Sequence, residues 1–386
     1  MERKTNRTHL SQVAGLLSLG LLLQIVFTYP LWMYEEWRSL PTIPLTPYLS
    51  LAFLSFDFIN LILLTVVLLI IMFAPQRKIS YIVFIVLMVL MWLQDSARFL
   101  HPIYTFSVLL ALLYFQQEKY EKQLLQALQM AMIGIYFWAG IYQLHPYFIE
   151  WVTTKDWWTN VAVESFQVMA YSPGILAILT AFGLFFARTR LYTLGIAVLY
   201  HLLILGLHWS PETAYYPLQW IFHITSICLL FVLFRTDTKA IFHQSGNFIK
   251  TFPIVPYAFI IFGTVPFFQF SFDLHPTFAL RPLSIQTSDV TFFFHRQDRF
   301  CLTPEIEPFV FTNSTGGNNQ KILNLSLEKW YTTELGVPFY QNEQQRKVLL
   351  KELCSCLDYE HQGGFTVVER DLWQLEEVVI KLRCKE

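Results

Sequence analysis

The chain has 386 residues, of which 54% are hydrophobic, 17% aromatic and only 14% charged, and its mean hydropathy is +0.43. Soluble proteins carry about 25% charged residues, so this composition excludes an ordinary soluble protein and indicates a membrane protein with several spans. The formal net charge is −1. With no run of Lys and Arg and no zinc-type Cys pattern, nucleic acid is not an expected partner.

The chain begins with a basic segment, residues 1–9, followed by a long apolar run without a small-residue cleavage site. This pattern predicts an uncleaved first span and not a signal peptide. Apolar runs recur over the first two thirds of the chain, and they predict nine spans. Because several of the runs are short, counts of eight or ten spans are the alternatives. The predicted spans are residues 10–30, 49–73, 79–93, 101–115, 123–144, 173–187, 191–207, 217–234 and 252–272.

Basic residues gather in alternate connections between these runs. Because such residues stay on the cytoplasmic side, the pattern predicts a cytoplasmic N-terminus and, after nine spans, an extracytoplasmic C-terminus. The residues that carry this signal are Arg3, Lys4, Arg7, Arg77, Lys78, Lys119, Lys122, Arg188, Arg190, Arg235 and Lys239.

After the last apolar run the chain becomes polar. Short alternating runs predict strands at residues 290–294, 309–312, 321–325, 365–368 and 378–382. Gly316-Gly317-Asn318 favours a hairpin turn, and Ser326 is typical of the cap of a short helix that stops at Gly336. A second helix is expected over residues 344–357. The predicted fold is a polytopic α-helical membrane protein, with a transmembrane bundle at 1–272 and a small extracytoplasmic α+β domain at 273–386.

Four of the five cysteines lie in this C-terminal domain: Cys301, Cys354, Cys356 and Cys384. In an oxidising compartment they allow one or two disulfides, with three full pairings. Cys354 and Cys356 are too close in sequence to pair with each other, so we expect each to pair with a distant partner. Unpaired buried thiols are the alternative.

Polar residues interrupt the apolar region between the third and fourth spans. Asp95 and Arg98 are three residues apart, so on a helix they share a face and are expected to pair. An unpaired charge at membrane depth is costly whatever its role. Such a pair more often fixes helix ends than takes part in catalysis. His101 follows them at the start of the fourth span.

The segment 131–158 begins as a membrane helix, passes a small-residue step at Ala139-Gly140 and ends in a run of Tyr, His, Trp and Glu. Polar groups held at a membrane face by aromatic residues are functional candidates. Trp157 is expected first in an interfacial aromatic belt, with stacking on a ligand as the alternative.

His201 lies inside an apolar run, where a core histidine with satisfied hydrogen bonds is the ordinary interpretation. His208 and His223 are the histidines that could bind a metal ion together with His201. Their spacing along the chain matches no standard helical ligand pair, so no metal is expected. The sequence also contains no nucleophile elbow, P-loop or dinucleotide fingerprint.

Three stretches resemble motifs of the horizontally transferred transmembrane (HTTM) domain, in the right order along the chain. Residues 92–104 (WLQDSARFLHPIY) resemble the segment in which an Asp and an Arg precede the turn into the next helix. Residues 136–144 (YFWAGIYQL) resemble the Tyr-x-x-Ala-Gly-x-x-Lys-Leu signature. Arg188-Thr-Arg190 followed by Tyr200-His201-Leu202 resembles the later Arg-Thr-Arg and Phe-His-Leu pattern.

This family includes the vitamin K-dependent gamma-carboxylases, in which oxidation of a reduced naphthoquinone generates a strong base for proton removal. The resemblance therefore implies a hydrophobic pocket open to the outer face that binds a quinone or a lipid. The lysine of the signature is Gln143 in this chain, and an amide takes up no proton near neutral pH, so gamma-carboxylation by the same route is not expected. The short C-terminal domain is another departure; it resembles the tail of bacterial membrane proteins that share the Gly140, Leu144 and Pro146 step.

On this resemblance, a catalytic site would use Asp95, Arg98, His101 and His201. His101 would be the acid–base group, because imidazole titrates near neutrality. Gln143 would orient the ligand by hydrogen bonding. The complete set of expected ligand-binding residues is Tyr136, Gly140, Gln143, His145 and Trp157.

The sequence leaves open whether the protein is an enzyme. The alternative is a membrane anchor whose outer domain binds a partner protein in an envelope complex, with the enclosed polar residues tying helices together. The expected location is a bacterial inner membrane with a periplasmic C-terminal domain, or else an endomembrane with a lumenal one.

Overall fold

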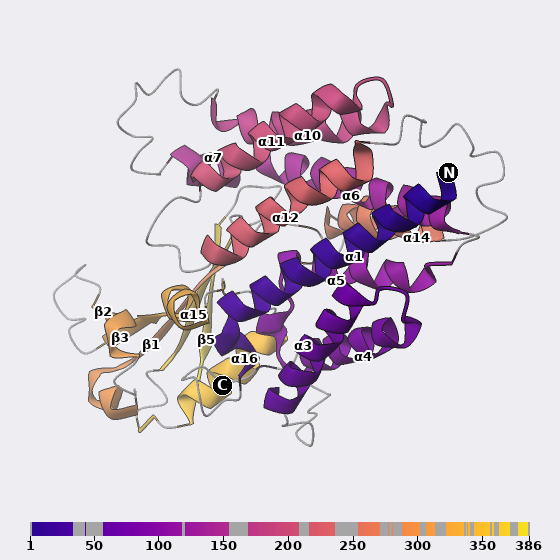
Figure 1. Ribbon diagram of the computed structural model, residues 1–386. Helices are drawn as coiled ribbons and strands as arrows, with labels where there is room; N and C mark the ends of the chain where they lie inside the picture. Colours follow the sequence, from indigo (N-terminus) through magenta and orange to yellow (C-terminus); the bar gives the residue numbers. More distant parts are fainter. Residues whose placement is uncertain are drawn as a thin grey trace.

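The chain is mostly helical and ends in a small β-sheet domain (Figure 1). The computed structural model describes residues 2–33, 43, 57–117, 120–153, 169–207, 216–235, 254–270, 277, 280, 288–301, 306–312, 322–335, 337, 339, 343–355, 357–358, 363–370 and 377–384.

Four helices within these ranges are long and apolar enough to cross a membrane. They are α1 (Glu2–Phe27) from Thr8 onward, α6 (Glu121–Gln143), α11 (Arg190–Leu207) and α12 (Tyr216–Phe234) from Pro217 onward.

The other apolar helices are shorter. They are α3 (Asp57–Phe73), α4 (Lys78–Gln94), α5 (His101–Leu112) with its 3₁₀ extension η4 (Leu113–Phe115), α10 (Ser172–Phe185) and α14 (Ile254–Phe259), which continues through η6 (Ile260–Thr264) and η7 (Val265–Phe270). Each predicted apolar run overlaps one of these helices or one of the four long ones. Helical turns at their ends are α2 (Tyr29–Trp32), η3 (Ser96–Arg98) and α7 (Pro146–Thr153).

Several helices expose apolar stripes on their outer faces. On α4 the side chains of Ile79, Ile82, Val86 and Val89 recur at helical spacing and are 43–65% exposed. Exposed leucine, isoleucine and phenylalanine side chains recur on α3 and α10 in the same way. In water such stripes would cost free energy, whereas lipid tails solvate them. They are therefore compatible with an integral membrane protein.

Helix α6 lies at the centre of the bundle and packs against α10 and α14, with α1, α5 and α12 also in contact. Glycines permit its close crossings, because small residues let membrane helices approach. A Cβ atom on Gly140 would lie 2.9 Å from the backbone oxygen of Gly174 on α10. One on Gly134 would lie 2.5 Å from the backbone oxygen of Phe262.

The C-terminal domain is an antiparallel five-stranded sheet in the order β2-β3-β1-β4-β5. Along β1, Val290, Phe292 and Phe294 are buried at a period of two, which directs one face of the strand into the core. The elements are β1 (Ser288–His295), η8 (Arg296–Cys301), η9 (Glu307–Phe309), β2 (Val310–Phe311), β3 (Ile322–Ser326), α15 (Leu327–Leu335), α16 (Glu343–Cys354), β4 (Gly364–Arg370) and β5 (Glu377–Arg383).

The predicted strands and helices of this domain are confirmed within one to three residues at each end. Ser326 caps α15 as expected, since its Oγ accepts from the backbone N–H of Lys329 at 3.4 Å. Strands β2 and β3 pair as a hairpin, and the predicted turn at Gly316-Gly317-Asn318 lies outside the described residues.

A disulfide joins Cys354, at the end of α16, to Cys384 after β5, with their Cα atoms 5.7 Å apart. This confirms that Cys354 pairs with a distant cysteine. The side chains of Cys301 and Cys356 lie outside the described part of the chain.

The sheet domain contacts the end of the bundle opposite the N-terminus (Figure 1). Helix α15 packs on α2, which follows α1. The hydroxyl of Thr277, which precedes the sheet in sequence, donates to the backbone oxygen of Phe99 at 2.7 Å. Phe99 lies between α4 and α5, so the polar domain is fixed to the helix ends where the cavity described below lies.

Replacing Gly134 by Ala is expected to destabilise the protein by about 1–3 kcal/mol, because the added methyl group overpacks the crossing between α6 and η6. The matched control is Gly195→Ala on α11, where an added Cβ meets nothing within 4 Å. Thermal unfolding in detergent should show a lower midpoint for the first variant only. Equal midpoints would contradict this packing of α6.

Candidate functional site

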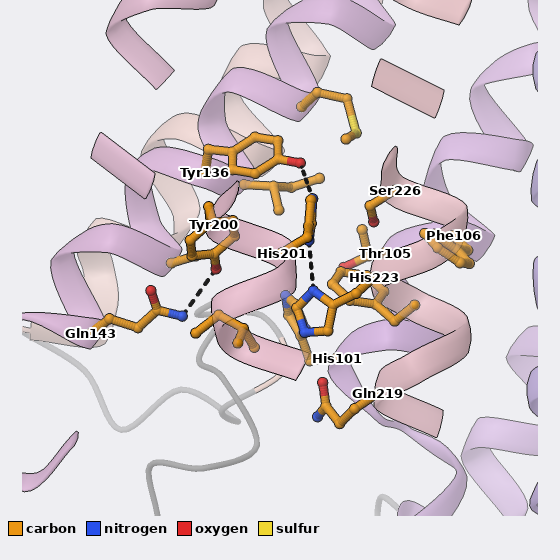
Figure 2. Close-up of a pocket in the computed structure, with 15 residues that line it drawn as sticks. His101, Thr105, Phe106, Tyr136, Gln143, Tyr200, His201, Gln219, His223 and Ser226 are labelled. Atoms are coloured by element: carbon orange, nitrogen blue, oxygen red, sulfur yellow. Dashed lines mark hydrogen bonds between the residues drawn. The ribbon is translucent and has the colours of Figure 1, made fainter. Parts of the chain in front are cut away.

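A cavity lies among α5, α6, α11 and α12 (Figure 2). Its space totals about 650 Å³ including the part open to the outside, and the enclosed part holds only a few water-sized groups. The lining residues are His101, Thr105, Phe106, Met132, Ile135, Tyr136, Ala139, Gln143, Tyr200, His201, Ile204, Gln219, Phe222, His223 and Ser226.

Three side chains from three helices form a continuous hydrogen-bonded chain along the cavity (Figure 2). The hydroxyl of Tyr136 on α6 lies 2.5 Å from Nε2 of His201 on α11. Nδ1 of His201 lies 2.8 Å from Nδ1 of His223 on α12. Both nitrogens of His201 therefore have protein partners, as expected of a core histidine, and both partners also line the cavity.

Gln143 and Tyr200 form a second polar pair. The side-chain N–H of Gln143 donates to the hydroxyl of Tyr200 at 3.0 Å, and the Tyr200 ring packs edge to face on Tyr136 at 5.8 Å. The amide oxygen of Gln143 is buried and has no partner among the described residues. This oxygen is an acceptor only.

Nε2 of His101 and the hydroxyl of Thr105 are likewise buried without a hydrogen-bond partner in the described part of the chain. His101 begins α5 and packs edge to face on Phe222 at 5.5 Å. Buried polar groups in native proteins are nearly always paired, with protein or with bound molecules. Three such atoms lie around this one cavity, and others, such as those of Ser18 and Gln24, lie elsewhere in the described bundle.

Among the described lining residues there is no Asp, Glu, Lys or Arg. The walls are aromatic and aliphatic, with hydroxyl, amide and imidazole groups between them. This arrangement can hydrogen-bond a neutral molecule and exchange protons with it, but it offers no fixed charge to pair with an ion. The described residues also contain no group of three or more His, Cys, Asp or Glu side chains placed to hold a metal ion.

Asp95 and Arg98 form the predicted ion pair at 3.9 Å, and both are buried. Arg98 also donates to the backbone oxygen of Leu31 at 2.9 Å and lies over the ring of Trp32. The pair does not line the cavity. It joins the end of α4 to α2, which is the helix-end role expected first from the sequence.

The remaining predicted residues are divided between the cavity and its surroundings. His101, Tyr136, Gln143 and His201 line the cavity together. Gly140 lies at the crossing of α6 and α10. His145 accepts through Nδ1 from the backbone N–H of Tyr147 at 3.2 Å, at the start of α7. Trp157 and His208 lie outside the described residues.

Sequence reasoning did not assign Thr105, Tyr200, Gln219 or Ser226 to the site, and it weighed His223 only as a metal ligand. A signal was present on α12, where Gln219, His223 and Ser226 recur at i, i+4 and i+7 in an otherwise apolar helix. That spacing places them on one face.

Comparisons of the chain with protein-family models, with curated proteins and with solved structures find no match.

Replacing Arg98 by Met is expected to cost about 3–5 kcal/mol of stability, because the buried carboxylate of Asp95 then loses its cation. The double variant Asp95→Asn/Arg98→Met should regain a large part of that loss, since no charge remains buried. Thermal unfolding in detergent measures both. The control is Arg188→Met, at an exposed position. An unchanged unfolding midpoint for Arg98→Met would contradict this structural role and would leave a catalytic role for the pair.

Proposed function

We propose that this chain is an integral membrane protein of the HTTM and gamma-carboxylase-like type, and that its cavity binds a hydrophobic small molecule such as a quinone or a lipid. The observation that carries the proposal is the set of buried polar atoms without partners around one cavity: Nε2 of His101, the hydroxyl of Thr105 and the amide oxygen of Gln143.

The lining limits the chemistry of the ligand. Because the amide oxygen of Gln143 only accepts hydrogen bonds, the ligand presents an O–H or N–H group to it, which a lipid head group or the reduced, hydroquinone form of a quinone supplies. The walls carry no formal charge, so the bound group is neutral. The enclosed space is small, so a polar head group lies inside and any apolar tail leaves through the open side.

The proposed topology has nine spans, with the N-terminus in the cytoplasm and the C-terminal domain outside. The alternating basic residues support it. The Cys354–Cys384 disulfide supports it too, because disulfides persist in oxidising compartments. A periplasmic domain on a bacterial inner membrane is the proposed location, with a lumenal domain on an endomembrane as the alternative.

Mass spectrometry of the protein purified in mild detergent tests the ligand proposal. The wild type is expected to carry a stoichiometric quinone or lipid. His101→Ala and Gln143→Leu should each retain about tenfold less, because one net hydrogen bond of about 1.4 kcal/mol is lost. His145→Ala, outside the cavity, is the control. A preparation without a small molecule, or equal retention in all variants, would sink the proposal.

A second function, partner binding by the outer domain, is favoured by one observation. The side chains of Val378 and Val379 on the terminal strand β5 are more than half exposed, and exposed apolar groups on a sheet edge are typical of interaction sites. The same preparation separates the two functions: a stoichiometric polypeptide, unchanged in the His101 variant, would favour the membrane-anchor alternative.

The proposed orientation predicts that the Cys354–Cys384 bond exists in living cells. Thiols blocked before lysis, followed by peptide mapping, should recover the two cysteines as one linked peptide pair. A cytoplasmic domain would instead yield both as blocked thiols, because reducing systems there keep thiols free. Cys228, a free cysteine in α12, is the internal control for blocking under denaturing conditions.

A further inference from the structure

The size of the cavity limits the head group of its ligand. The part that water-sized groups can occupy measures about 40 Å³. One water molecule needs roughly 10–15 Å³ of such space, whereas a benzene ring is held by a cavity of about 150 Å³. The enclosed part therefore has room for about four non-hydrogen atoms of a ligand. A hydroquinone head, with six ring carbons and two oxygens, is too large for it.

The unpaired polar atoms lie on two sides of this space. Figure 2 shows Gln143 on one side of the cavity, and His101 and Thr105 on the other. Gln143 is the last residue of α6, and His101 is the first residue of α5. Thr105 follows His101 by four residues, so the two share a face of α5. A ligand that serves both sides needs a polar group for each.

Hydroxyl groups fit both sides. The amide oxygen of Gln143 only accepts, so the group beside it donates. On the other side, Nε2 of His101 donates or accepts according to the tautomer of the ring, and the hydroxyl of Thr105 can do either. A hydroxyl of the ligand matches them in every case, because it both donates and accepts. Two hydroxyls on adjacent carbons are four atoms, which is the number that the enclosed part holds.

The wall that α6 contributes changes from polar to apolar along the helix. Met132, Ile135, Ala139 and Gln143 lie on one face and line the cavity together. At 1.5 Å per residue, Met132 is about 16 Å along the axis from Gln143. Such a wall matches an amphiphile, with a small polar head at the Gln143 end and a hydrocarbon chain beyond it.

We propose that the cavity binds a neutral lipid whose head group carries two hydroxyls on adjacent carbons, as in a monoacylglycerol. One hydroxyl donates to Gln143, the other bonds with His101 and Thr105, and the acyl chain follows the apolar lining of α6. Lipids with a phosphate or carboxylate head are excluded, because the lining offers no cation to a buried anion. This inference rests on the proposed ligand site and names its substrate class.

The test is native mass spectrometry of the delipidated protein with an equimolar mixture of probes that share one chain. The probes are 1-mono-oleoylglycerol, oleyl alcohol, oleic acid and a hydroquinone with an oleyl tail. The glyceride is expected to be retained about tenfold more than oleyl alcohol, because its second hydroxyl adds one net hydrogen bond. Equal retention of these two would overturn the diol assignment, and preferred retention of oleic acid would overturn the neutral head group.

The remaining outcomes separate this inference from the ligand site on which it rests. Retention of the hydroquinone in place of the glyceride would overturn the inference and leave the site standing. Retention of none of the four probes would overturn both. Free glycerol, added at the concentration of the glyceride, should not displace it, because glycerol lacks the chain. Displacement by glycerol would overturn the assignment to a lipid.

A matched pair of threonine variants tests the contact on α5. Thr105→Val removes the hydroxyl and nearly keeps the shape of the side chain, so the tenfold preference for the glyceride over oleyl alcohol should disappear. Thr180→Val is the control, because the hydroxyl of Thr180 on α10 donates to the backbone oxygen of Leu176 at 2.8 Å and does not line the cavity. A preference kept in the first variant or lost in the second would overturn the assignment. The wild-type series decides the ligand class whether or not the variants fold.

Discussion

A polar atom inside an apolar helix bundle has no water to pair with, and this constraint organises the whole structure. Several buried polar side chains meet it by donating across the bundle to a backbone oxygen. Gln129 of α6 donates to Leu233 of α12 at 2.7 Å, and the indole of Trp138 donates to Gly263 at 3.0 Å. Such bonds join segments about a hundred residues apart in sequence, and with the glycine crossings of α6 they fix which helices are neighbours.

The exceptions to this pairing are informative because three of them surround one cavity. His101, Thr105 and Gln143 come from two helices, yet their unpaired atoms belong to the same enclosed space. Desolvating a polar atom without a partner costs about 1–3 kcal/mol, so three together would be an expensive defect unless something fills the space. The buried charges of Asp95 and Arg98 differ from these atoms because they have partners: they pair with each other, and Arg98 also donates to a backbone oxygen of α2.

The sequence predicted what depends on local pattern. Apolar runs, strand periodicity, the Ser326 cap and the i, i+3 pairing of Asp95 with Arg98 are all properties of neighbouring residues, and the structure contains each of them. Which polar residues share a cavity depends instead on how α6, α11 and α12 pack. The sequence alone therefore named His201 as a candidate without its partners Tyr136 and His223, and it did not assign Tyr200 to the site. The partner of Cys354 was open for the same reason, because it lies thirty residues away, after β5.

Gln143 connects the sequence argument to the cavity. The resembling family has lysine at this position of its signature, and a lysine here would bring a charge into a cavity whose described lining has no carboxylate to pair with it. A buried, unpaired ammonium is strongly disfavoured. The amide avoids that cost and donates to Tyr200, and its oxygen has no partner among the described residues.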